Sequence, residues 1–190
     1  LEVKCSGRRK AQILLIIITF FSFVLLFRNL YVAISLMIAT LLHECGHYLA
    51  IKKLFKEFNG GIFFIPCLGA ATMGNINQEP RGLEGAIISI AGPISGIICG
   101  LIFMALSHFF PKIIIIELLM LSSFILNGIS ILPVHQLLDG GKLICYLLRT
   151  KNNPLAISPL LTIFLLIQTV IIVMMASPYA ERFFIILANK

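Results

Sequence analysis

The chain has 190 residues, of which 59% are hydrophobic and 12% are charged, and its mean hydropathy is +1.03. A soluble domain of this length cannot bury so much apolar side chain, so the composition excludes a soluble protein and indicates an integral membrane protein in a lipid bilayer. The net charge of +7 predicts no nucleic-acid partner, because the basic residues flank apolar runs and set membrane topology. The five cysteines lack paired or metal-ligand spacing, and their odd number argues against a complete disulfide framework.

Five apolar segments are predicted to cross the membrane as helices: residues 11–27, 31–54, 85–106, 113–132 and 158–176. The first is predicted to be a retained span, because it is too long for a cleaved signal peptide and few small residues follow it. Residues 59–77 are apolar but broken by Gly and Pro, which predicts a short hairpin or re-entrant loop at membrane depth. An ordinary amphipathic surface loop is the alternative for this segment.

The predicted fold class is therefore an all-α membrane protein of about five transmembrane helices with a short membrane-inserted β-hairpin or re-entrant loop. We expect one membrane-embedded domain over residues 1–190, with its core at about 30–150 and additional spans at 11–27 and 158–176.

The distribution of Lys and Arg predicts the orientation of the spans. With the N-terminus inside, eleven of the 15 basic residues lie inside, and four lie outside (Arg28, Lys112, Arg182 and Lys190). The C-terminus is then outside, and His43 precedes the inner Lys52 by roughly 13 Å along a helix at 1.5 Å per residue. Chemistry carried by His43 is therefore expected in the inner half of the bilayer.

The predicted helix 31–54 carries the sequence His43-Glu44-Cys45-Gly46-His47, an H-E-x-x-H motif. Positions i and i+4 share a helix face, so His43 and His47 can offer two imidazoles to one metal ion. Glu44 lies close enough to take a proton from a metal-bound water. Ionisable side chains are costly in an apolar helix, which favours a functional site over a chance motif. Cys45 points away from this face and is predicted to serve packing.

A second ionisable group is expected at the same depth. Asp139 lies in Leu138-Asp139-Gly140-Gly141, where the two glycines are predicted to break the fourth span just before the inward-facing Lys142. His135, four residues earlier, is the alternative metal ligand from this segment.

These motifs resemble those of the site-2 protease family of intramembrane zinc metalloproteases, in particular its compact, sporulation-type members. The resemblance covers roughly residues 11–150 and rests on the H-E-x-x-H motif, on Ala91-Gly92-Pro93 and on Leu138-Asp139-Gly140-Gly141. It implies one zinc ion per chain held by His43, His47 and Asp139, with Glu44 as the catalytic base. It also implies that the segment Ile62, Phe63, Phe64 and Ile65 pairs with an unwound substrate as an added strand.

The chain departs from the family pattern at two positions, where Gly96 and Ser130 replace expected asparagines. An amide at such a position can donate a hydrogen bond to a developing oxyanion. Asn127, Ser130 and Asn75 are the candidates to replace this donor or to orient the substrate.

The predicted function is hydrolysis of a peptide bond in or near a transmembrane segment of a substrate protein or a membrane-held peptide. One alternative is a metal-ion transporter or channel, since intramembrane His and Asp also mark ion pathways. That reading predicts an internal repeat and a polar path on both sides of the site, and neither is seen. A second alternative is an inactive relative that binds membrane helices without cutting them. The family's compact members favour a multi-pass protein of the bacterial cell membrane with a cytoplasmic N-terminus.

Overall fold

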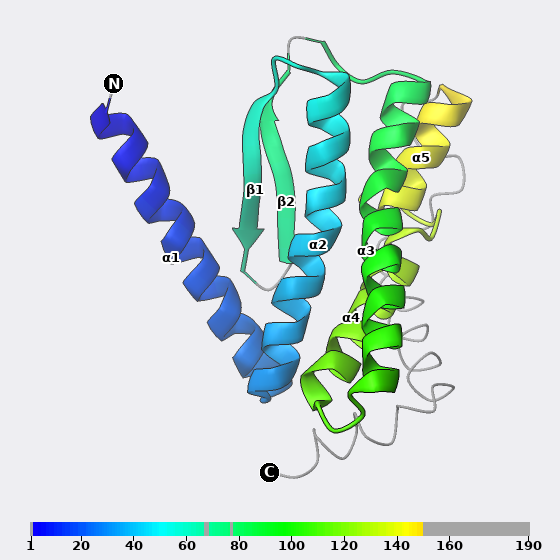
Figure 1. Ribbon diagram of the computed structural model, residues 1–190. Helices are drawn as coiled ribbons and strands as arrows, with labels where there is room; N and C mark the ends of the chain where they lie inside the picture. Colours follow the sequence, from blue (N-terminus) through cyan, green and yellow to red (C-terminus); the bar gives the residue numbers. More distant parts are fainter. Residues whose placement is uncertain (1, 67–68, 77, 150–190) are drawn as a thin grey trace.

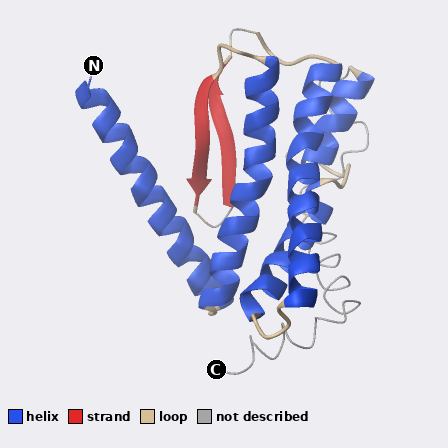
Figure 2. Ribbon diagram, in the orientation of Figure 1, coloured by secondary structure: helices blue, strands red, loops and turns tan. Residues whose placement is uncertain are grey.

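The computed structural model describes residues 2–66, 69–76 and 78–149, with side chains from residue 11 onward. This part of the chain folds into five helices and a two-stranded antiparallel sheet, which confirms the predicted fold class (Figures 1 and 2). In chain order the elements are α1 (Glu2–Phe27), α2 (Leu30–Leu54), β1 (Asn59–Ile65), β2 (Gly69–Asn75), α3 (Leu83–Phe109), α4 (Ile114–Ser130) and α5 (Asp139–Leu148). The predicted span 158–176 lies outside the described residues.

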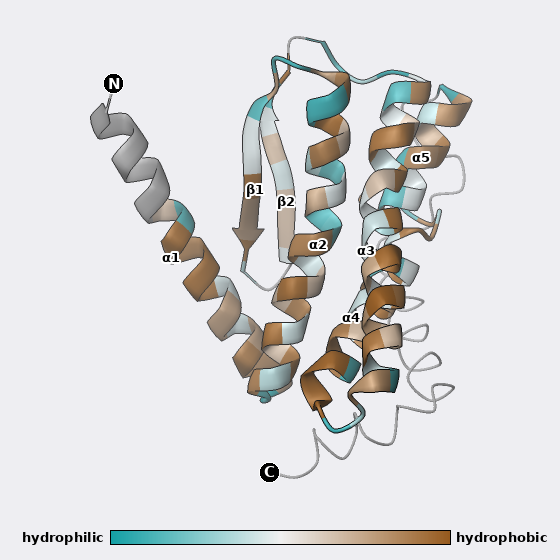
Figure 3. Cartoon of the chain, viewed as in Figure 1, coloured by the Kyte–Doolittle hydropathy of each residue, from teal (hydrophilic) through white to brown (hydrophobic). Residues whose placement is uncertain are grey.

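The helices have the length and surface of membrane-embedded elements. Among the described residues, α2 and α3 are long and apolar enough to cross a bilayer, while Ala11–Phe27 and Ile114–Ser130 are shorter apolar helices. Large apolar side chains point outward from them, and Leu25, for example, is 78% exposed. Figure 3 shows hydrophobic residues mainly in the lower halves of the helices, and hydrophilic residues along the upper half of α2 and in the connection beside its end. Such a surface is stable only in contact with lipid.

Helix α2 lies at the centre and packs against α3, α4 and both strands. Its buried residues recur every three or four positions, as expected for one helix face; they are Val32, Ala33, Ser35, Ala39, Thr40, His43, Glu44, Gly46 and His47. At the end near α4, Val32 packs with Leu118, Met120 and Leu121 in an apolar core. The buried stripe turns polar toward the C-terminal half of α2, where the functional residues lie.

The hairpin lies between α1 and α2, with β1 contacting α1 and β2 contacting α2 (Figure 1). Both ends of the hairpin are tightly packed. A Cβ on Gly60 or Gly74 would overlap the ring of Phe58, and a Cβ on Gly69, whose φ is +117°, would lie 3.2 Å from Thr40. This packing shows that the segment is a hairpin docked on α2, and it excludes the surface-loop alternative.

The segment around Asp139 differs from the prediction. The Asp-Gly-Gly sequence was expected to interrupt the fourth span, but α4 ends at Ser130 and a separate helix, α5, begins at Asp139. A carboxylate in the first turn of a helix is favoured by the helix dipole. The connection folds back closely on this turn, since a Cβ on Gly140 would overlap the carbonyl oxygen of Ile131. The glycines therefore allow close approach at the start of a helix and do not end one.

Candidate metal centre

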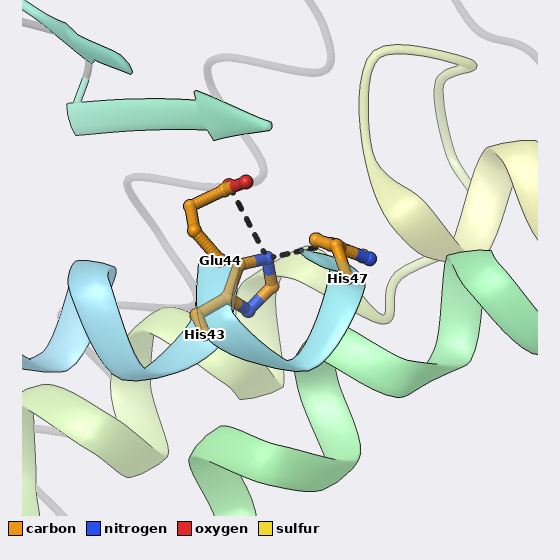
Figure 4. A group of neighbouring side chains, drawn as sticks. All are labelled: His43, Glu44 and His47. Atoms are coloured by element: carbon orange, nitrogen blue, oxygen red, sulfur yellow. Dashed lines mark hydrogen bonds and ion pairs between the residues drawn. The ribbon is translucent and has the colours of Figure 1, made fainter. Parts of the chain in front are cut away.

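The H-E-x-x-H motif forms the buried part of the site on α2. His43, Glu44 and His47 are 6%, 7% and 8% exposed, and their ligand atoms lie within 4.8 Å of one another (Figure 4). The Nε2 atoms of the two histidines are 3.1 Å apart, because one helical turn places them on the same face. The predicted pair of imidazoles is thus present on one face of α2.

Asp139 brings a third ligand atom from α5. Its Oδ2 lies 3.0 Å from His43 Nε2 and 3.2 Å from His47 Nε2. Its other oxygen, Oδ1, accepts a hydrogen bond from Lys142 Nζ at 3.1 Å. The structure therefore brings together the three residues that were predicted to bind a metal. Oδ2 of Asp139 faces the two histidines, while Oδ1 is held by Lys142.

The three ligand atoms fit a tetrahedral zinc site. Ligand bonds of about 2.0–2.1 Å at a tetrahedral angle separate neighbouring ligand atoms by roughly 3.3 Å. The separations here are 3.0, 3.1 and 3.2 Å. Three ligands on one side also leave a fourth position for water, as catalytic zinc sites require.

The hydrogen bonds of the other imidazole nitrogens support this interpretation. His47 Nδ1 lies 2.7 Å from the carbonyl oxygen of Ile88, and His43 Nδ1 lies 2.7 Å from Asn127 Oδ1. A carbonyl oxygen only accepts, so His47 Nδ1 carries the proton. The amide of Asn127 is oriented in the same way, because its Nδ2 donates to the carbonyl oxygen of Ser123 at 2.6 Å. In the neutral imidazoles both Nε2 atoms then present lone pairs to the centre beside a carboxylate oxygen, an arrangement that a cation stabilises.

Glycines of α3 make room for these side chains. A Cβ on Gly92 would overlap the His47 imidazole, and a Cβ on Gly96 would overlap the Asn127 amide. On α2, a Cβ on Gly46 would overlap the carbonyl oxygen of Ala91. The small residues of the Ala-Gly-Pro motif thus allow α3 to lie directly behind the ligand-bearing turn of α2.

Glu44 lies beside the ligand cluster and not within it. Its Oε1 is 4.0 Å from His43 Nε2, while its Oε2 accepts a hydrogen bond from Thr72 Oγ1 of β2 at 2.7 Å. This distance from the ligand atoms suits a base that acts on a ligand water.

A cavity of about 380 Å³ opens onto the cluster. Its walls come from α2, β2, α3, α4, α5 and the turn before α5; the polar residues among them are Thr40, His43, Glu44, His47, Thr72, Ser89, Ser130, Asp139, Lys142 and Tyr146. The described part of the structure thus joins a buried ligand cluster to a space that can hold a peptide backbone.

The other sequence candidates lie at different distances from this cavity. Ser130 borders the cavity. Asn127 is fully buried behind His43, and its side-chain amide forms hydrogen bonds with His43 Nδ1 and with the Ser123 carbonyl. Asn75 lies at the far end of β2 and is exposed. His135 makes no described contact with the ligand cluster, and its Nδ1 accepts a hydrogen bond from the backbone of Leu137.

The predicted substrate-pairing segment lies on the strand away from the cluster. Ile62, Phe63 and Phe64 of β1 line a second cavity, of about 330 Å³, together with residues of α1. Ala70, Ala71 and Thr72 of β2 line the cavity at the ligand cluster. A chain paired with the outer edge of β1 would therefore lie three strand spacings, roughly 14 Å, from a chain paired with the outer edge of β2 near Glu44.

Comparisons with known proteins identify the fold. No protein-family profile matches the chain. Over 122 residues it is 30% identical to a zinc metalloprotease from Methanocaldococcus jannaschii, a match that covers 62% of this chain and 34% of that protein. The chain thus spans about a third of that relative's length. Its structure is similar to that of a site-2 protease from Methanocaldococcus jannaschii, with a TM-score of 0.55 and 20% identity over 93% of this chain and 82% of the other. The chain has the site-2 protease fold. Its own apolar helices, with large apolar side chains on their outer faces, agree with a membrane protein.

Three residues that contact the site in this fold were not predicted from the sequence. Thr72, Ile88 and Lys142 contact Glu44, His47 and Asp139, respectively. Lys142 follows Asp139 by one helical turn, so recognising the helix start would have predicted their ion pair. Thr72 and the Ile88 carbonyl come from other elements and leave no local signal.

Proposed function

We propose that the chain is an intramembrane zinc metalloendopeptidase of the site-2 protease family. It hydrolyses a peptide bond in or near a transmembrane segment of a substrate protein, or in a membrane-held peptide. The observation that carries this proposal is the convergence of His43 Nε2, His47 Nε2 and Asp139 Oδ2 within 3.2 Å of one another, beside Glu44 and an open cavity. One zinc ion per chain matches this set of two nitrogens and one oxygen.

The residues have separate tasks in this reaction. Zinc, when bound, supplies a Lewis acid that polarises the scissile carbonyl and acidifies water. Glu44 accepts the proton of the attacking water and passes it to the leaving amine nitrogen. Ser130 borders the cavity, and its hydroxyl, which donates to the Asn127 carbonyl at 3.2 Å, is the proposed donor to the developing oxyanion once it rotates toward the cavity. Lys142 holds Asp139 through Oδ1, so that Oδ2 stays directed toward the histidines.

We place an extended substrate segment along β2 at Ala70–Thr72, because these residues line the cavity at the ligand cluster. Main-chain hydrogen bonds to a strand edge hold a peptide in the extended form that a protease requires. Pairing with Ile62–Ile65 would place the substrate nearer to α1, so the two edges predict different sites of cross-linking.

We further propose that the protein belongs to the compact, sporulation-type group and lies in a bacterial cell membrane. The Lys and Arg distribution supports a cytoplasmic N-terminus, an outer C-terminus and a site in the inner half of the bilayer.

The first experiment measures the metal content of the detergent-purified protein beside His47→Ala and Asp139→Ala. We expect about one zinc per chain in the native protein and strong loss in both variants, since each removes one of three ligands. Zinc that persists in Asp139→Ala would contradict the ligand set. A native chain that binds no metal after loading would contradict the metalloprotease proposal.

Cleavage is then tested with reconstituted membrane substrates. A peptidase loses cleavage in Glu44→Gln and keeps its zinc, whereas a transporter moves zinc across vesicles without cutting. An inactive helix-binding relative binds the substrate both as the native chain and as Glu44→Gln, and neither protein cuts it.

A further inference from the structure

A hydroxyl group of the hairpin contacts the residue proposed as the catalytic base. Thr72 Oγ1 donates to Glu44 Oε2 at 2.7 Å and lies 3.1 Å from the backbone oxygen of Glu44. The shorter of these contacts is typical of a hydrogen bond to a carboxylate. The contact joins two elements far apart in sequence.

The two oxygens of Glu44 consequently face different partners. Oε2 is engaged by Thr72, while Oε1 is directed toward the ligand cluster, 4.0 Å from His43 Nε2. We propose that Thr72 is a positioning residue, which holds the Glu44 carboxylate so that Oε1 receives the proton of the attacking water. This inference rests on the proposed function, because it assigns a task to the base of that reaction.

The hairpin is suited to hold this side chain in place. Thr72 lies in the middle of β2, opposite Ile62 of β1 in the antiparallel register. Its β-branched side chain has restricted rotation about χ1. The strand itself is fixed by the packing of Phe58 against Gly60 and Gly74. The hydroxyl therefore meets Glu44 from a rigid support, and a free glutamate would otherwise sample several rotamers.

Two substitutions separate a hydrogen-bonding role from a packing role. Thr72→Val keeps the shape and the β-branch but removes the hydroxyl, whereas Thr72→Ser keeps the hydroxyl and removes a methyl group. If Thr72 serves to hold Glu44, Thr72→Val lowers the cleavage activity and Thr72→Ser retains it. If Thr72 serves only to pack the hairpin, Ser is the more harmful of the two.

The kinetic test uses the zinc-loaded full chain in detergent. We expect Thr72→Val to lower kcat by roughly 10- to 100-fold, the range for residues that orient active-site groups, with KM and zinc content unchanged. Thr72→Ser should stay within about threefold of the native kcat by the same comparison. Thr19→Val is the matched control, because within the described part of the chain Thr19 Oγ1 bonds inside α1, to the Leu15 carbonyl. If Thr72→Val does not accumulate in membranes, Thr72→Ala removes the same hydroxyl.

A second readout requires no activity. The infrared difference spectrum between a metal-free protein and its Glu44→Gln derivative isolates the carboxylate stretches of Glu44. We expect these bands to shift in Thr72→Val and to be retained in Thr72→Ser. Unshifted bands, or a native kcat in Thr72→Val, would overturn the inference while leaving the proposed function intact. Absence of zinc or of cleavage in the native chain would instead overturn the proposed function, and the infrared result would still report the contact.

Discussion

The glycine at position 96 and the asparagine at position 127 are expected to act as a pair in support of His43. Asn127 is fully buried and its Oδ1 lies 2.7 Å from His43 Nδ1. A Cβ on Gly96 would overlap all three terminal heavy atoms of the Asn127 side chain, Nδ2, Cγ and Oδ1. We predict that Gly96→Ala displaces this amide and thereby weakens zinc binding, although position 96 touches no ligand.

The magnitude follows from the contacts that are lost. Overpacking a tight interior costs about 1–3 kcal/mol of folding free energy. The displaced amide also leaves the buried His43 Nδ1–H without its partner, at about 1–3 kcal/mol. Loss of a hydrogen bond that orients a histidine ligand typically lowers metal affinity about 10- to 100-fold.

The assay is a competition titration with a chromogenic zinc chelator in detergent, combined with thermal unfolding. Gly128→Ala is the matched control, because a Cβ at Gly128 meets no atom of the described residues within 4 Å. We expect native zinc affinity in this control and a 10- to 100-fold loss, in order of magnitude, in Gly96→Ala.

The decisive step is a double-mutant cycle with Asn127→Ala. Once the amide is absent, Gly96→Ala has nothing to displace, so the double variant should bind zinc about as well as Asn127→Ala alone. We expect a coupling energy of about 0.5–3 kcal/mol between the two positions. Additive losses would refute the reasoning, because they would show that Gly96 supports the site by a route other than Asn127.

Three further predictions concern the proposed base, the metal ligands and the helix that carries Asp139. Glu44→Gln should abolish cleavage, with zinc still bound at about one per chain by metal analysis; full cleavage would contradict its role as base. Asp139→Ala should lose zinc and His135→Ala should keep it, since only Asp139 lies beside the histidines. Gly140→Ala should lower the free energy of unfolding by about 1–3 kcal/mol, because its Cβ would overlap the Ile131 carbonyl. The zinc content should fall as well, since Asp139 is the neighbouring residue. An unchanged melting temperature would contradict this.

Much of the fold could be predicted because membrane insertion leaves a strong local signal. Apolar runs predicted α2, α3 and α4 close to their observed bounds, and Gly and Pro predicted the hairpin between α2 and α3. The prediction was wrong around Asp139, where a glycine pair was read as the end of a helix. Whether such glycines end a helix or permit close packing depends on the neighbouring backbone, which here is the connection near Ile131.

The sequence by itself determined the chemistry available to this protein. A helical period fixes His43 and His47 on one face, and an apolar setting makes Glu44 between them a functional candidate. Only the tertiary structure decided which partners complete the site. Asp139 reaches the histidines, Asn127 orients His43 and Thr72 holds Glu44, each from a different element. These contacts join residues that lie far apart in the chain, so no periodicity or spacing encodes them, and they appear only when helices and hairpin pack.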